Sequence, residues 1–337
     1  MSQLSTTPAI PDLAPPADPA PRRRFRVQRS TLSGLAPLVA VLALGGALTV
    51  ANPRFIDPRS LSALADSAAP LAMLAIGATV VVLCGGIDLS IGALASLSSV
   101  LLAMWIPTLG SAAIPAVVAT AAAAGLLQGV LHVVFRIPSF VVTLGGMTIF
   151  SAIALVISDA GTVPVTDTSV TKWAFDRIGD YIPTSVILVL VVVTLVTVVL
   201  RVTPVGTWIA AIGYTEPAAR LAGLPVYPVK VAAFTLSGTT AGLAAVLLVA
   251  RTYAGNPTMA DSLLLPAVAA IVVGGTAITG GHGGLWRTMA GAIIVTMLRV
   301  GLSVVGVPSA YESILYGVLV IGAVAMTIDR SKVGVIK

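Results

Sequence analysis

Stretches of about twenty predominantly apolar residues recur along most of this 337-residue chain. A helix needs about 20 such residues to cross the hydrocarbon core of a bilayer. The runs are continuous rather than alternating, which favours helices over the strands of a membrane barrel. The sequence therefore predicts an all-α, polytopic membrane protein with about ten transmembrane helices. The stretches are 32–51, 67–83, 87–106, 112–134, 140–158, 185–200, 230–250, 263–279, 285–306 and 311–328. Nine or eleven spans stay open, because Gly-rich joins blur two boundaries.

Charged side chains are too few for a water-soluble surface. Asp, Glu, Lys and Arg make up 9% of the residues, against about 25% in a typical soluble domain. This excludes a soluble enzyme and a disordered chain. A secreted disulfide scaffold is also excluded, because Cys84 is the single cysteine. In so apolar a chain, the net charge of +6 indicates cytoplasmic loops rather than a nucleic-acid partner.

The basic residues predict the sidedness of the loops. With both termini cytoplasmic and alternating spans, thirteen basic residues face the cytoplasm, five face outward, and Arg299 lies within a span. This asymmetry favours an even number of spans, because basic residues concentrate on the cytoplasmic side. The inward set is Arg22, Arg23, Arg24, Arg26, Arg29, Arg136, Arg201, Arg220, Lys230, Arg287, Arg330, Lys332 and Lys337. The outward set is Arg54, Arg59, Lys172, Arg177 and Arg251.

Composition divides the chain into three parts. We expect residues 1–30 to form a Pro-rich, basic, disordered cytoplasmic tail. Residues 31–329 form the transmembrane domain and 330–337 a cytoplasmic C-terminal tail. The basic run before the first span resembles a twin-arginine export signal, but nine further spans favour a simple basic flank.

The chain also resembles itself at an offset of 195 residues. Ala65-Asp66-Ser67 precedes Gly85-Gly86 by the same spacing as Ala260-Asp261-Ser262 precedes Gly280-Gly281, with nine identities over some 35 residues. The offset aligns spans 1–4 with spans 7–10, which predicts a parallel internal repeat, a known device of transporters. Coincidence in an Ala/Gly/Leu-rich chain is the alternative.

The sequence contains no catalytic set and no metal site. It lacks the Gly-x-x-x-x-Gly-Lys-Ser/Thr loop that cradles phosphates, so we expect no cofactor here and ATP hydrolysis, if needed, in another chain. His132 and His282 stand far apart without paired carboxylates or cysteines, which indicates loop or capping roles.

Three glycine-containing segments interrupt the apolar pattern. The first is Gly85-Gly86-Ile87-Asp88-Leu89-Ser90-Ile91-Gly92. An acid between two membrane spans is a functional candidate by default. Asp88 and Ser90 could instead cap the next helix by accepting its free N–H groups. Both interpretations stay open: a structural cap, or contact with a substrate or partner.

The second segment is the cytoplasmic stretch between Thr203 and Lys230. Thr215 suits a cap, Glu216 and Pro217 suit a first helical turn, and Gly223 suits a stop. A helix of about two turns is marginal in water, so it needs a partner that buries Ala218, Ala219 and Leu221. That partner is either another subunit or the membrane domain of the same chain.

The third segment runs from Gly274 to Gly284. Its glycines, among them Gly274, Gly275, Gly280, Gly281 and Gly283, predict a broken or re-entrant helix. Such a break is tolerated only where protein or a water-filled cavity surrounds it. Its amides could form an anion-binding nest, although close packing and turning is the other reading.

Taken in order, these three segments resemble the permease subunit of ABC importers of the ribose, xylose and arabinose type, over roughly residues 35–328. The resemblance implies a permease dimer in the cytoplasmic membrane of a prokaryote, an ATP-binding partner subunit and an extracytoplasmic solute-binding protein. It also implies that the short cytoplasmic helix couples to the ATPase. The candidate coupling residues are Thr215, Glu216, Ala218, Ala219, Arg220 and Gly223.

The sequence departs from that family in two places. Relatives usually read Asn-Pro-Glu-Ala-Ala where this chain has Thr215-Glu216-Pro217-Ala218-Ala219, so the contact of the acid is in doubt. Leu264, Leu265 and Pro266 replace acidic residues that often precede the eighth span, which leaves the solute open. No substrate-binding residue is assigned. A monosaccharide is the central expectation, with a branched-chain amino acid or nucleoside as alternatives.

The rival function is a secondary transporter or channel driven by an ion gradient. It needs buried carboxylates as ion or proton sites. Asp88 is the strong candidate, because Asp66, Asp261 and Glu312 stand near the ends of spans.

Overall fold

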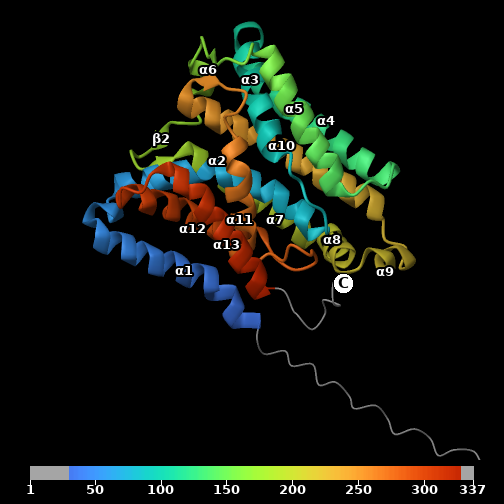
Figure 1. Cartoon of the computed structure of the whole chain (residues 1–337). Coiled ribbons are helices and arrows are strands. Elements are labelled where there is room, and N and C mark those ends of the chain that lie inside the picture. The colour runs from blue at the N-terminus through green and yellow to red at the C-terminus, as the bar shows by residue number, and fades with distance from the viewer. Residues whose placement is uncertain (1–29, 328–337) are drawn as a thin grey trace, which may run out of the picture.

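A computed structural model describes residues 30–327, and most of this range is helical (Figure 1). The tails expected at 1–30 and 330–337 lie outside the described residues, apart from Ser30. The first half of the chain contains α1 (Ser30–Ala51), η1 (Pro53–Ile56), α2 (Pro58–Leu83), α3 (Ile91–Leu109), η2 (Gly110–Ala112), α4 (Ala113–Val134) and α5 (Ser139–Ile157). Short elements follow: β1 (Val163–Pro164), α6 (Ser169–Lys172), β2 (Arg177–Ile178) and β3 (Ile182–Pro183).

The second half of the described chain is also helical. It contains α7 (Thr184–Val202), α8 (Val205–Tyr214), α9 (Glu216–Leu221), α10 (Val226–Thr252), β4 (Ala254–Gly255), η3 (Asp261–Leu263), α11 (Leu264–Val273), α12 (Leu285–Val304), η4 (Ser309–Tyr311) and α13 (Glu312–Thr327). Within the described range, six helical stretches are long and apolar enough to cross a membrane. One of them, Ile91–Val134, joins α3 and α4 through η2.

Glycine lets the central helices approach closely. Gly125 and Gly129 of α4 are spaced four apart, as are Gly238 and Gly242 of α10. A Cβ atom at Gly125 would lie 3.1 Å from the Gly238 Cα, and one at Gly242 would lie 3.0 Å from the Ala121 Cβ. Helices in a bilayer associate through such small-residue stripes, because lipid provides no hydrophobic drive. The sequence pattern thus places α10 against α4.

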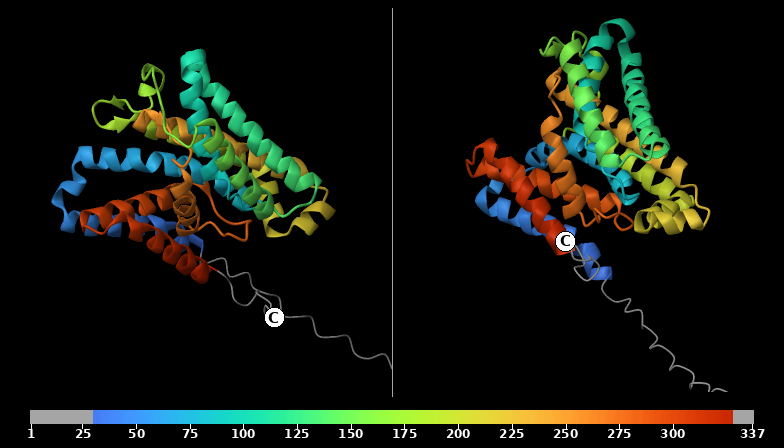
Figure 2. Two further views of the ribbon diagram at one scale, coloured as in Figure 1. Left: turned by 45° about the horizontal axis from the view of Figure 1, so that its top comes forward. Right: turned by 45° about the vertical axis from the view of Figure 1, so that its right-hand side comes forward.

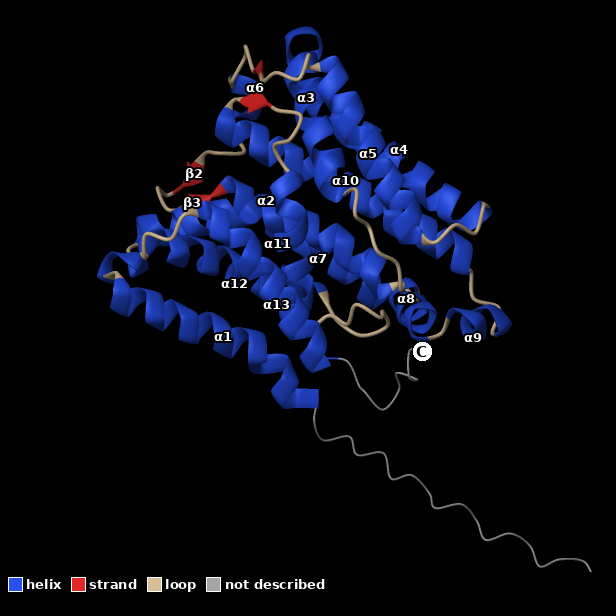
Figure 3. Ribbon diagram, in the orientation of Figure 1, coloured by secondary structure: helices blue, strands red, loops and turns tan. Residues whose placement is uncertain are grey.

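Short elements lie at opposite ends of the body formed by the long helices (Figure 2). At one end, β1 pairs antiparallel with β4 (Val163 with Gly255), and β2 pairs with β3 (Ile178 with Ile182). Figure 3 shows these strand pairs near α6. At the other end, α8 and α9 lie together.

Several helices differ from the sequence predictions. The helix α2 begins at Pro58, well before the predicted stretch 67–83. The eighth stretch, 263–279, is helical only to Val273, because the chain turns at Gly274 and Gly275, and Gly275 has φ +82°. The glycines of this segment predict a break, but the predicted span extends six residues beyond the helix that is present. The sequence prediction also missed α8, whose ten residues form a separate apolar helix after Pro204.

Candidate functional site

Backbone from all three glycine segments meets at one place, which we call the glycine junction: Gly85, Gly213, Gly280 and Gly281. A Cβ atom at Gly280 would lie 2.8 Å from the Gly85 nitrogen and 3.1 Å from the Gly213 Cα. A Cβ at Gly213 would collide with the Leu83 carbonyl oxygen and the Gly281 nitrogen. Only glycine permits this approach, so the junction ties the end of α2 to the end of α8 and to the α11–α12 loop.

Hydrogen bonding and backbone conformation fix the junction further. The Gly281 N–H donates to the Leu83 carbonyl oxygen, with an N···O distance of 3.0 Å. Gly85, Gly280 and Gly281 have φ angles of +76°, +88° and +74°, a region that side chains with a Cβ rarely adopt. Tyr214, the last residue of α8, lies directly against Gly281. Movement of α8 therefore reaches α2 through backbone contacts.

The remaining glycines of the segments have separate surroundings. Gly92, in the first turn of α3, faces the Ala260 carbonyl oxygen, 2.9 Å from the position of a Cβ. Gly274 packs against the backbone of Arg287, and Gly283 against the side chain of Thr276. Gly86 faces Val81, whereas Gly275 faces open space.

Asp88 lies in a buried polar cluster between α3, α4 and α10. It is 6% exposed. Its Oδ1 accepts from the Ser90 N–H at 2.9 Å and the Ser90 hydroxyl at 2.7 Å, and its Oδ2 accepts from the Ser237 hydroxyl at 2.7 Å. Gln128 of α4 also bonds the Ser90 hydroxyl, at 3.0 Å. Both carboxylate oxygens are thus occupied by donors from the same chain.

The capping expectation for this segment is wrong in its details. Ser90 occupies the N-cap position of α3, but its side chain makes no capping bond. The hydroxyl instead donates to Asp88 and accepts from the Gln128 amide, so its oxygen is engaged within the buried cluster rather than with the helix N–H groups. Asp88 bonds the N–H of Ser90 itself rather than those of the first turn.

Glu216 begins α9 and is tied to two cations. Its Oε2 lies 2.5 Å from the Lys230 Nζ, and its Oε1 lies 2.5 Å from Arg220 Nη2. Lys230, in the first turns of α10, is only 8% exposed. Its Nζ also lies 3.3 Å from Nε2 of His132, which belongs to α4. Arg220 in turn stacks 4.7 Å above the Tyr227 ring. These contacts hold α9 to α4 and α10.

The charge on Glu216 depends on these partners. Partial burial raises the pKa of its carboxyl group, but hydrogen bonds from Lys230 and Arg220 outweigh that effect and leave the pKa below its usual value. Glu216 is therefore ionised at neutral pH, when it binds both cations.

The outer face of α9 is apolar and uncovered. Ala219 packs inward, whereas Ala218, Ala222 and Gly223 are exposed and Leu221 is 91% exposed. Gly223 ends the helix with φ +75°, and a Cβ there would meet no atom within 4 Å. Thr215 precedes the helix, but its hydroxyl donates to the Tyr214 carbonyl oxygen rather than capping the helix.

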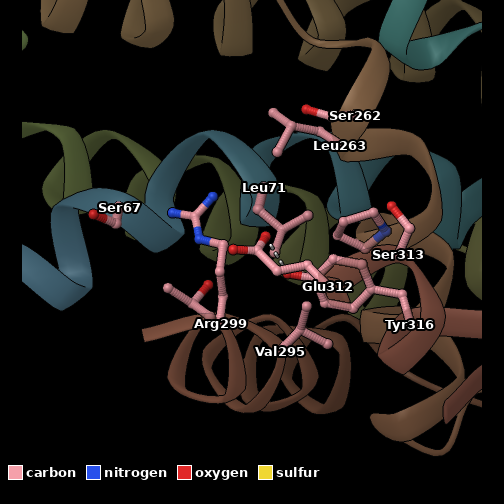
Figure 4. Close-up of a pocket in the computed structure, with 11 residues that line it drawn as sticks. Ser67, Leu71, Ser262, Leu263, Val295, Arg299, Glu312, Ser313 and Tyr316 are labelled. Atoms are coloured by element: carbon pink, nitrogen blue, oxygen red, sulfur yellow. Dashed lines mark hydrogen bonds between the residues drawn. The ribbon is translucent and has the colours of Figure 1, made fainter. Parts of the chain in front are cut away.

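A polar pocket lies near the end of α2 that is remote from the junction (Figure 4). It has a volume of about 290 Å³, and it is lined by Ser67 of α2, residues of η3 and α11, Arg299 of α12 and Glu312 of α13. Figure 4 shows the Arg299 and Glu312 side chains pointing into the same space. Both residues are apparent in the sequence, but no local pattern there assigns them a role. The sequence feature that could have indicated this pocket is Arg299, an arginine within an otherwise apolar span.

Among the described residues, no three His, Cys, Asp or Glu side chains gather as a metal site. Cys84 is buried and free.

Comparison with known proteins gives relatives over most of the chain. Residues 60–324 match a family described as branched-chain amino acid transport system / permease component. The chain is 34% identical to the ribose import permease protein RbsC of Bacillus subtilis, over 88% of this chain and 93% of that protein. It is 32% identical to RbsC of Escherichia coli, with the same coverage. It is 29% identical to the fructose import permease protein FrcC of Rhizobium meliloti, over 86% of this chain and 83% of FrcC. No solved structure matches the chain.

Proposed function

The chain belongs to the family of branched-chain amino acid transport system permease components, and from this premise we propose that it carries a monosaccharide inward for a binding-protein-dependent ABC importer. It is a multi-pass transport subunit of the cytoplasmic membrane, and ATP is hydrolysed by a separate partner subunit. The relatives named for ribose and fructose import support a monosaccharide over an amino acid or nucleoside. We place the transmembrane permease domain at residues 31–329.

The observation that carries the coupling role is the position of α9. It leaves Leu221 91% exposed, while Glu216 ties the helix to the buried Lys230. The Glu216–Lys230 pair anchors one side of the helix, and the exposed leucine on the other side suits insertion into an apolar groove of a partner. The ATP-binding subunit is that partner. Force on α9 then passes through α8 to the glycine junction and from there to α2 and the α11–α12 loop.

A substitution on this face tests the coupling role. Leu221→Asp removes the apolar anchor and adds a charge, while the buried Ala219 and the Glu216–Lys230 pair stay in place. We expect the ATP-binding subunit to be lost from the purified complex. Val305→Asp is the matched control, because Val305 is 71% exposed near the other end of the molecule. Equal retention of the ATP-binding subunit by both variants would refute α9 as its docking site.

For topology we propose ten spans with both termini cytoplasmic, namely α1, α2, α3, α4, α5, α7, α10, α11, α12 and α13. Each of the ten apolar stretches overlaps one of these helices. In this layout α9 is inside and the β1–β4 pair outside. The single cysteine makes the test direct. In a Cys84→Ala background, Ala222→Cys should react only with a reagent inside the vesicle and Thr166→Cys only from outside. The reverse pattern would overturn the layout.

The parallel repeat is supported by the helix bounds. The offset of 195 residues carries α3, Ile91–Leu109, onto 286–304, and α12 spans Leu285–Val304. The repeat-related Gly85 and Gly280 also lie in contact at the junction. The complete transporter would contain a second permease copy, an extracytoplasmic solute-binding protein and surrounding lipid.

A further inference from the structure

We propose that the pocket between α2, α11, α12 and α13 is a binding station for a single neutral polyol molecule, with Arg299 and Glu312 as its principal hydrogen-bonding groups. The proposal rests on the proposed function, because it assigns a place in this chain to the imported monosaccharide. The pocket is separate from α9 and from the glycine junction.

Neither Arg299 nor Glu312 is neutralised by an ion pair among the described residues. Within residues 30–327, the ion pairs join Glu216 to Arg220 and Lys230. The Tyr316 hydroxyl lies at 3.5 Å from Glu312 Oε2, which leaves Oε1 available. Charged side chains in membrane helices are costly and face a cavity or a partner. Here they face a pocket of about 290 Å³.

The rest of the lining suits a sugar. Hydroxyl groups come from three elements, at Ser67 of α2, Ser262 of η3, and Ser313 and Tyr316 of α13, and they alternate with apolar walls such as Leu71 and Val295. The serine hydroxyls bond no other described residue. A sugar presents hydroxyl groups at its edge and C–H groups on its faces, so it needs this mixture. The volume is at the low end of the roughly 300–1,000 Å³ typical of ligand pockets, which favours one small solute.

Along α2, the pocket lies far from the glycine junction. Ser67 and Leu83, the residue bonded to the glycine junction, are 16 positions apart, or about 24 Å along the helix. In the proposed topology the pocket is therefore near the outer face, where a binding protein releases solute, and the junction is near the inner face. Ser67 and Ser262 are related by the 195-residue offset, so the pocket lies where the two repeat copies meet.

A zwitterionic amino acid is the competing occupant. Its carboxylate could pair with Arg299 and its ammonium group with Glu312. An amino acid carries its two polar groups on one carbon, whereas a polyol carries hydroxyl groups around its whole edge and can reach hydroxyls that come from three elements. The observations favour the polyol, and the test separates the two.

The test measures uptake by the complete complex in proteoliposomes, with the ATP-binding subunit and binding protein present. The probes are radiolabelled D-ribose, 2-deoxy-D-ribose and L-leucine. The variants are Arg299→Gln and Glu312→Gln. Arg251→Gln serves as control, because Arg251 is an exposed arginine outside the pocket. ATP hydrolysis stimulated by the loaded binding protein is recorded in parallel.

We expect each pocket variant to lower D-ribose uptake about tenfold, the effect of removing a hydrogen bond to a charged group. ATP hydrolysis and the control should be unchanged. The preference for D-ribose over 2-deoxy-D-ribose should shrink in at least one variant. The binding protein is the same in every arm, so its own preference cancels from this comparison.

Three results would overturn the proposal. The first is unchanged D-ribose uptake in both variants. The second is loss of L-leucine uptake with D-ribose uptake intact, which assigns the pocket to an amino acid. The third is equal loss for all probes with the D-ribose preference unchanged, which indicates a structural role. If a Gln variant fails to fold, Arg299→Lys and Glu312→Asp give the same comparison. Failure of the wild-type complex to take up any sugar would instead overturn the proposed function.

Discussion

Lys230 reaches from the start of α10 to Glu216 at the start of α9, and its ammonium nitrogen lies 2.5 Å from the carboxylate oxygen. The two residues differ in surroundings, since the Lys230 side chain is 10% exposed and that of Glu216 31% exposed. A buried ammonium needs its anion, so this pair fixes the position of α9 more firmly than an exposed ion pair would. The account of coupling depends on that attachment.

Replacing Lys230 should weaken the docking of α9 more than replacing Arg220, the other cation that pairs with Glu216. Lys230→Met removes the buried hydrogen bond, which should cost about 2 kcal/mol of α9 docking and reduce recovery of the ATP-binding subunit. Arg220→Gln removes the exposed partner, which should cost about 1 kcal/mol or less. Hydrogen exchange of the α9 amides measures the difference. Equal protection of α9 in the two variants would refute the ranking.

Glu216 should also report on this attachment through its titration. Its pKa is lowered when α9 is docked, so the stabilisation is present above the ordinary value of 4.5 and is lost as pH falls through the docked pKa. The pair is therefore intact at pH 6 to 8. A carbon-13 NMR titration of the Glu216 carboxyl should give a pKa below that ordinary value. In Lys230→Met the pKa should rise, and an unchanged pKa would mean that the pair is absent in solution.

The glycine junction should not accept a methyl group. In Gly213→Ala the new Cβ would collide with the Leu83 carbonyl and the Gly281 nitrogen, which are backbone atoms that cannot turn aside. We expect about 3 kcal/mol of destabilisation, at the upper end for overpacking. Gly145→Ala in α5 is the control, because a Cβ there meets no atom within 4 Å. Thermal unfolding in detergent measures both variants. A normal melting temperature for Gly213→Ala would show that the junction is open in the native protein.

Asp88→Asn separates a structural acid from an ion-coupling acid. The substitution keeps the shape but replaces one acceptor oxygen by an NH2 donor that faces a serine hydroxyl. We expect a loss of about 1 to 3 kcal/mol from the unsatisfied buried group, with ATP dependence of uptake retained. Uptake by the wild type that follows a proton or sodium gradient, and is abolished in Asp88→Asn, would support the rival secondary transporter.

Much of this molecule could be predicted from local sequence. Long apolar runs and their glycine breaks predicted the helical, membrane-spanning character and a break within the segment from Gly274 to Gly284, since both depend on nearby residues. The three ordered segments predicted the permease family, and this is confirmed by relatives that cover 88% of the chain.

Long-range contacts could not be predicted in the same way. The glycine junction joins Gly85, Gly213 and Gly281, which are far apart in sequence and have no pattern that pairs them. Ser90 was expected to cap a helix because it directly precedes one. Its bonds to Asp88 and Gln128, and the bond of Ser237 to Asp88, join side chains from different helices and have no signal in the local sequence. The charges of Arg299 and Glu312 were visible, but their shared pocket depends on how four helices pack.

The most direct test of the account is D-ribose uptake into proteoliposomes that contain this chain and its ATP-binding subunit. The account predicts D-ribose uptake only when ATP is present on the side of the ATP-binding subunit and loaded binding protein is present on the opposite side. It also predicts that the Leu221→Asp variant takes up no D-ribose. Uptake by this chain alone, driven by an ion gradient without ATP or binding protein, would contradict it.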